Sequence, residues 1–193
     1  MKVTIHFVLR LQFFPVFGVR ISYISLKNFV QVERIPGIIY NGNDSYRKET
    51  GVMIMVRTAT LTDLPILKEL YALSLQEKAA MQPAIFQNAQ TPEEFLRQKL
   101  SRKTAGVFLA VLERDHVGFA IVQATPSAAC DCLVPHLYAR VVDLYVRREY
   151  RDRGLRQDLL DTMEEWARTR QLDYIEQTVV LPEKNAEEFL SDR

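Results

Sequence analysis

This sequence of 193 residues has little net charge, few cysteines and few long hydrophobic runs without a charge. Its 25 Lys and Arg residues nearly balance its 24 Asp and Glu residues, and the resulting net charge of +1 does not favour a protein that binds nucleic acid through charge. The two cysteines, Cys130 and Cys132, indicate a reduced cytoplasmic protein rather than a disulfide-stapled secreted one. Arg10 and Arg20 interrupt the apolar N-terminal stretch, so no uncharged window reaches the roughly 18 residues of a membrane span. We therefore expect no membrane association.

A metal site is not predicted either. Cys130, Cys132 and His136 are residue types that bind zinc, but three ligands at a C-x-C-x3-H spacing are weak evidence for it. The composition, with 48% apolar and 25% charged residues, is that of an ordinary globular domain. A domain of that kind needs neither metal nor disulfide for stability.

Residues 1–52 differ from the rest and are interpreted as an N-terminal extension to a domain at 53–193. The first part is apolar and aromatic, and 35–52 is rich in turn-forming residues without a sustained period. Two explanations stay open. Either translation starts downstream, at Met53, or the chain carries a real amphipathic extension that is disordered or membrane-associated.

The spacing of apolar residues predicts a mixed-sheet α/β domain. The expected strands cover 56–59, 107–112, 117–124, 138–146 and 174–181, and the expected helices begin near 63, 91, 154 and 184. The polar connection 113–116 is short enough for an antiparallel hairpin, whereas the two strands around the helix at Gly154 should be parallel. Leu64, Leu67, Tyr71 and Leu75 recur at helical spacing and should face the core.

The segment from Val141 to Arg170 is predicted to carry the chemistry. A strand ends at Val146 and continues through an arginine-rich, glycine-containing turn into a helix. The first turn of a helix leaves backbone N–H groups without partners, and the helix dipole favours negative charge there. This pattern indicates a site for a phosphate-bearing ligand; the alternative is a solvated arginine turn.

The same segment resembles the GNAT superfamily of acyl-CoA-dependent N-acyltransferases. The match is most specific from Asp143 to Leu160, and the family's pyrophosphate signature Arg/Gln-x-x-Gly-x-Gly/Ala falls on Arg151 to Arg156. The resemblance implies transfer of an acetyl group from acetyl-CoA to a primary amine of a small molecule or protein. It implies that the backbone of Leu144, Tyr145 and Val146 holds the pantetheine arm. It likewise implies that the pyrophosphate is cradled by the turn and the helix start: Arg151, Asp152, Arg153, Gly154, Leu155, Arg156 and Gln157.

Two departures from the family pattern put turnover in question. Arg156 stands where the family has Gly or Ala, and its side chain either crowds the pyrophosphate or binds it. The family's usual general acid is a tyrosine near the C-terminus, where this chain has Leu190, and two terminal strands are absent. Their absence should expose a sheet edge and invite a homodimer. The alternative function is therefore a truncated, non-catalytic CoA-binding domain.

Two strand residues are the candidate catalytic groups. Asp143 alternates with Leu144 and Val146, so it should point away from the face that those two bury. It is a candidate base or amine-binding group, or else a solvent-facing carboxylate. Tyr145 is a candidate general acid in place of the missing tyrosine, although a role in the core is favoured.

Overall fold

The computed structural model describes residues 7–13, 19–26, 38–41, 44–49, 52–83, 85–87, 89, 92–127 and 134–181. Within them the strands are β1 (Phe7–Phe13), β2 (Val19–Leu26), β3 (Ile38–Asn41), β4 (Asp44–Glu49), β5 (Val52–Thr58), β6 (Ala105–Leu112), β7 (Asp115–Pro126), β8 (Leu137–Val146) and β9 (Tyr174–Leu181). The helices are α1 (Leu64–Met81), α2 (Glu93–Ser101) and α3 (Leu155–Thr169), with short 3-10 helices η1 (Leu61–Asp63) and η2 (Arg148–Arg153). All of these strands join one sheet in the order β1-β2-β9-β8-β7-β6-β5-β4-β3.

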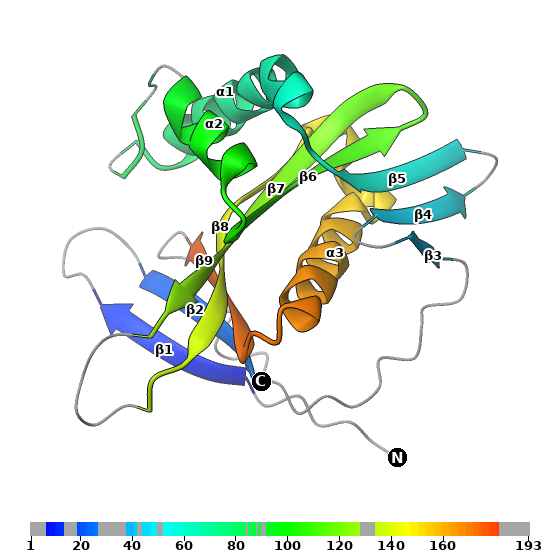
Figure 1. Ribbon diagram of the computed structural model, residues 1–193. Helices are drawn as coiled ribbons and strands as arrows, with labels where there is room; N and C mark the ends of the chain where they lie inside the picture. Colours follow the sequence, from blue (N-terminus) through cyan, green and yellow to red (C-terminus); the bar gives the residue numbers. More distant parts are fainter. Residues whose placement is uncertain are drawn as a thin grey trace.

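Helices cover both faces of this sheet (Figure 1). On one face, α1 and α2 pack over a cluster of buried residues that includes Leu67, Leu96 and Phe119. On the other, α3 packs through Leu159, Met163 and Trp166. Strand β6, in the interior of the sheet, is buried on both sides, which explains its continuous apolar run. The predicted mixed α/β fold is thus confirmed.

The element order expected from the sequence is also confirmed between β5 and β9. β6 and β7 form the expected antiparallel hairpin, although residues 113–114 alone connect them, because Asp115 and His116 already pair with Leu112 and Val111. β8 and β9 are parallel. The arginine-rich turn forms η2, a 3-10 helix that the sequence pattern did not predict. The helix expected near residue 91 is α2, which begins at Glu93. The helix expected near residue 184 lies outside the described residues.

The sheet is open between its two parallel strands. On one side, β8 pairs with β7 along its whole length. On the other, β8 pairs with β9 only at Ala139–Ile175 and Arg140–Glu176. From Val141 onward the two strands separate, so half of the backbone groups in the second part of β8 have no strand partner. This opening positions the candidate site.

The edge of β9 is paired, so the exposed edge expected from the sequence is wrong. All eight residues of β2 pair antiparallel with β9, from Val19–Leu181 to Leu26–Tyr174, and β1 pairs with β2. In Figure 1 this N-terminal hairpin lies at the opposite end of the sheet from β3 and β4. Two strands that precede the domain in sequence therefore occupy the end of the sheet next to β9, and the reason for expecting a second chain there is removed.

The turn that leads into α1 is held by a charged side chain. Asp63 directly precedes α1 but makes no side-chain bond to the first turn of that helix. Its carboxylate instead accepts the Thr60 N–H at the start of η1 (2.8 Å). Arg57 donates to both oxygens of that carboxylate, at 2.8 and 2.6 Å. These bonds, chiefly those from Arg57, hold the pKa of Asp63 far below its usual range.

We expect the substitution Asp63→Asn to lower the free energy of unfolding by about 1–2 kcal/mol near neutral pH, because it weakens the charge-assisted bonds to Arg57 and Thr60 that hold the turn into α1. Since the folded-state pKa of Asp63 is depressed, its contribution is complete above the unfolded pKa of about 3.9. It is lost as the pH falls towards the folded pKa. Urea unfolding at pH 7 and pH 3 measures this, and an equal difference between variant and wild type at both pH values contradicts it.

Candidate functional site

The main candidate site is a cavity of about 340 Å³ at the open side of β8. Its wall comes from the second half of α1, from the end of β8 and from the turn into α3. The lining residues are Ser74, Glu77, Lys78, Met81, Leu144, Tyr145, Val146, Arg151 and Arg156. Five of these were expected from the sequence, and the four on α1 were not.

The backbone of β8 offers bonding groups to this cavity. The Arg147 N–H donates to Val117 O on β7 (2.8 Å), so the preceding Val146 carbonyl points the other way, towards the open side. The backbone N–H of Leu144, two residues earlier, points to the same open side as the Val146 carbonyl. In this structure both are occupied by the chain itself: Asp143 Oδ1 accepts the Leu144 N–H at 2.8 Å, and Arg151 Nε donates to Val146 O at 3.0 Å.

Gly154 makes the sharp turn between η2 and α3. Its φ of 71° lies in the left-handed region, which a glycine adopts without strain. Leu155 is fully buried and anchors the helix start in the core, so only its backbone can serve a ligand. The Gln157 N–H donates to Gly154 O at 2.9 Å, which makes it a poorer phosphate donor than the amides before it. Asp152 and Arg153 are exposed and do not line the cavity.

Asp143 is buried rather than solvent-facing, with 6% of its side chain exposed. It points to the α1 face as its alternation with Leu144 predicts, but there it meets Lys78, whose ammonium donates to both carboxylate oxygens at 2.7 and 2.8 Å. The solvent-facing interpretation is therefore wrong. An ion-paired carboxylate that also accepts the Leu144 N–H is a better positioning group than a base.

Tyr145 has both a core ring and a polar end in the cavity. Its ring lies 6.1 Å from that of Phe119, and its hydroxyl donates to Glu77 Oε1 at 2.9 Å. Burial and the carboxylate of Glu77 raise the pKa of Tyr145 to about 12. The group therefore stays a neutral phenol at physiological pH, able to donate a hydrogen bond.

Glu77 and Lys78 line the candidate site, and the sequence reasoning missed both. Arg151 donates to Glu77 Oε2 and lies 5.9 Å from the centre of the Tyr145 ring. A signal was present: Ser74, Glu77, Lys78 and Met81 follow one another at helical spacing and continue the core-facing stripe of α1. A buried stripe that turns charged towards its end marks a helix face that leaves the core and enters a cavity.

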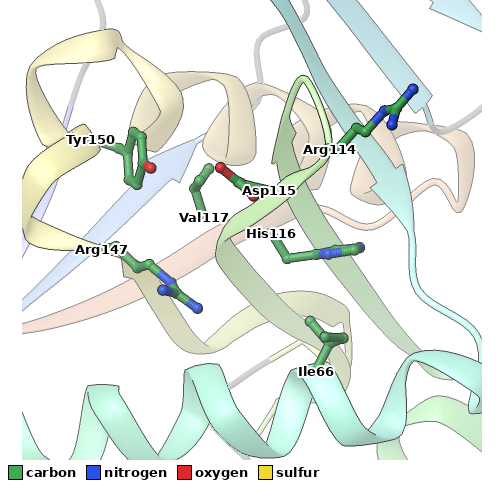
Figure 2. A pocket seen from close by; sticks show the side chains of 7 residues that line it. All are labelled: Ile66, Arg114, Asp115, His116, Val117, Arg147 and Tyr150. Atoms are coloured by element: carbon green, nitrogen blue, oxygen red, sulfur yellow. The ribbon is translucent and has the colours of Figure 1, made fainter.

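A second cavity, of about 310 Å³, lies on the other side of η2 (Figure 2). Its side chains come from the hairpin between β6 and β7, from the start of α1 and from η2, and they include His116, Arg147 and Tyr150. The His116 ring lies 3.3 Å from the Arg57 guanidinium. Arg147 already pairs with Glu69 (2.6 Å), and the cavity does not include the open backbone of β8. We therefore place the site in the first cavity.

The described residues contain no cluster of His, Cys, Asp or Glu that fits a metal ion. His136 instead contacts Val134 O (2.8 Å) and the Tyr174 hydroxyl (3.2 Å), while Cys130 and Cys132 lie outside the described residues. As for membranes, none of the helices in the described part of the chain has the length and apolarity of a span.

The parallel strands β8 and β9 separate, and β8 continues through a glycine turn into α3, with Arg151 and Arg156 at the start of that helix. This arrangement defines an acyltransferase-type α/β domain. Residues 67–191 match the model of the acetyltransferase (GNAT) family. The chain belongs to this family, as the resemblance of Asp143–Leu160 predicted.

Solved structures of low sequence identity have a similar fold. A tetramutant protein from Bacillus halodurans is 17% identical, with a TM-score of 0.60 over 71% of this chain and 90% of that one. An aminoglycoside acetyltransferase from an uncultured soil metagenomic sample, in complex with sisomicin, is 18% identical, with a TM-score of 0.53 over 72% and 85%. An acetyltransferase from Vibrio fischeri is 19% identical, with a TM-score of 0.50 over 62% and 91%. The comparison with curated proteins finds no match.

Proposed function

We propose that this protein transfers the acetyl group of acetyl-CoA to a primary amine of a small molecule or protein. The observation that carries the proposal is the opening between β8 and β9, which leaves backbone groups of Leu144 and Val146 directed into a cavity. A pantetheine arm is an extended amide chain, and such a chain can bond to a strand with a free side. The arm then leads to the turn at Gly154, where a helix N-terminus favours a pyrophosphate.

The Leu144 N–H is the proposed donor to the oxyanion. Attack of an amine on the thioester carbonyl forms the C–N bond and places negative charge on the carbonyl oxygen, and a preplaced N–H stabilises that charge. The nitrogen then loses its extra proton, the C–S bond breaks, and the departing thiolate takes up a proton, so that a neutral amide and the free thiol of CoA are released. In this scheme Asp143, held by Lys78, must give up the Leu144 N–H before the thioester carbonyl can bind there.

Calorimetric titration with acetyl-CoA tests binding, and thiol release over a panel of amines tests transfer. The panel should include aminoglycosides, because two of the structurally similar proteins are aminoglycoside acetyltransferases, from soil metagenomic DNA and from Acinetobacter baumannii. Binding in the micromolar range with thiol release on at least one amine is expected. Absence of binding at millimolar acetyl-CoA would overturn the proposal.

A non-catalytic CoA-binding domain is the second candidate, favoured by one observation. Leu190, outside the described residues, stands where the family has its tyrosine and cannot donate a proton. Tyr145 is the phenol that remains in the cavity, yet a pKa of about 12 makes it a reluctant proton donor to a thiolate. Binding of acetyl-CoA without turnover on any amine would favour this candidate. In either case we propose a cytoplasmic location, where acyl-CoA is available and cysteines stay reduced.

Arg156 provides a test of the pyrophosphate site. None of the described residues forms a hydrogen bond or ion pair with its guanidinium, and both desolvation and the nearby charge of Arg151 lower the pKa of Arg156. An anion would relieve this repulsion, so we expect Arg156→Ala to weaken acetyl-CoA binding by about tenfold, the value of one charge-assisted bond. If the arginine instead crowds the site, calorimetry will show tighter binding.

A further inference from the structure

We propose that Glu77 holds the charged amine of the acceptor, and that Arg151 occupies this carboxylate until the pyrophosphate of an acyl-CoA draws it away. The inference rests on the function proposed above and adds to it the acceptor class, a cationic amine. It concerns a residue on α1, outside the strand and turn that carry the family resemblance.

Arg151 spans the main cavity between two groups that a substrate would need. Its Nε donates to the Val146 carbonyl on β8 (3.0 Å), and its Nη2 donates to Glu77 on α1. The first contact occupies the Val146 carbonyl, a backbone group without a strand partner on β9 that would otherwise bond to the pantetheine arm. The second neutralises the carboxylate that faces the cavity. A single side chain therefore fills both positions when no ligand is bound.

A pyrophosphate at the start of α3 would compete for Arg151. Arg156 lines the same cavity without a partner among the described residues, so two guanidinium groups face one space. An anion placed between them gains charge-assisted bonds to both, whereas Glu77 offers Arg151 only one carboxylate at a partly exposed site. Transfer of Arg151 to the phosphates leaves the Tyr145 hydroxyl as the hydrogen-bond partner of Glu77 among the described residues.

Without Arg151, the Glu77 carboxylate is a negative charge that no side chain of the cavity lining neutralises. Asp143, the other nearby carboxylate, is neutralised by Lys78. Among the residues that line the cavity, Glu77 is the acidic one. A protonated amine entering beside Leu144 and Tyr145 meets this charge next to the expected thioester position.

Glu77 suits binding of an ammonium rather than removal of its proton. Burial tends to raise the pKa of Glu77, but the hydrogen bonds from Arg151 and Tyr145 outweigh this and lower it. Once Arg151 has left, Tyr145 still donates to this carboxylate. Even a glutamate with an ordinary pKa does not take the proton of an alkyl ammonium, whose pKa is about 10.4. Glu77 is therefore a specificity-determining group, and the proton leaves to solvent.

The substitution Glu77→Gln, which keeps an acceptor for Tyr145 and removes the charge, tests the proposal. We expect the KM for an alkyl amine to rise by about tenfold, the loss of one charge-assisted contact, while the KM for an uncharged aromatic amine stays unchanged. Acetyl-CoA should bind several-fold more tightly, because Arg151 no longer has to leave a carboxylate. If Glu77 had a merely structural role, its substitution would weaken the binding of the amine and of acetyl-CoA together.

Two controls make the result specific. Glu69→Gln, on the same helix but paired with Arg147 beside the other cavity, should change neither constant. In an Arg151→Gln background, Glu77→Gln should no longer tighten acetyl-CoA binding, because the competitor is gone. Unchanged or weaker acetyl-CoA binding by Glu77→Gln, or equal KM shifts for both amines, would overturn the inference. Wild-type protein that fails to bind acetyl-CoA overturns the proposed function instead. Should no amine in the panel be acetylated, the acetyl-CoA affinities alone decide the inference.

Discussion

Replacing Gly154 with valine is expected to abolish measurable acetyl-CoA binding while the domain stays folded. The glycine has a φ of 71°, where an L-residue costs about 1–2 kcal/mol and a β-branched residue more. The turn would relax and tilt the first amides of α3 away from the pyrophosphate. Each lost bond from an amide to a charged phosphate is worth about 1.5–3 kcal/mol, so two of them reduce affinity by at least about a hundredfold.

Calorimetry with acetyl-CoA and thermal melting measure the two effects separately. A melting temperature lower by only a few degrees, about 2–4 °C per kcal/mol for a chain of this size, would show that the fold survives. Gly154→Asn is the matched control, since asparagine tolerates the left-handed region. It should recover the melting temperature and part of the binding. Wild-type affinity in the valine variant would contradict the role given to this turn.

Deletion of residues 1–52 should leave a protein that aggregates. It removes β2 from all eight residues of β9 and β4 from β5, and so exposes two edges of the sheet at once. It also removes side-chain contacts of the described residues Asp44 and Ser45, which bond to the Thr58 N–H (2.8 Å) and to the Thr162 hydroxyl (3.3 Å). Long unpaired edges are templates for pairing between chains.

A second deletion separates the contributions of the two edges. A variant that lacks residues 1–37 loses β1 and β2 but keeps β3 and β4, so only the edge of β9 is exposed. We expect the soluble fraction and the melting temperature to fall in the order full chain, 1–37 deleted, 1–52 deleted. A soluble, monomeric 53–193 protein with unchanged melting temperature would contradict the strand pairing, and would favour a domain that begins at Met53.

Local signals predicted much of the domain between β5 and β9. The strand ending at Val146, the turn at Gly154 and the helix to Thr169 were each visible as a short-range pattern: a β-branched run, a glycine after arginines, and apolar residues every three or four positions. The pairing of β8 with β9 followed from the helix between them. These features depend on neighbours within a few residues, and so they can be predicted from the sequence.

The partners of the site residues could not be predicted in the same way. Asp143 is bound by Lys78, 65 residues away, Tyr145 by Glu77 at 68 and Arg151 by Glu77 at 74. The charged face at the end of α1 was present in the sequence as a stripe, but which strand it would meet depends on how α1 packs across the sheet. Glu77 therefore emerged only from the fold.

By itself, the sequence determined the fold class, the family resemblance and the backbone framework of the candidate site, because strand, turn and helix arise from local periodicity and from the conformational freedom of Gly154. Only the tertiary structure decided the chemistry around that framework: that Asp143 is buried against Lys78, that Arg151 rests on Glu77, and that β2 pairs with β9. The physical reason is that charge pairing and strand pairing act between segments far apart in the chain. Their partners are chosen by packing, which no local pattern records.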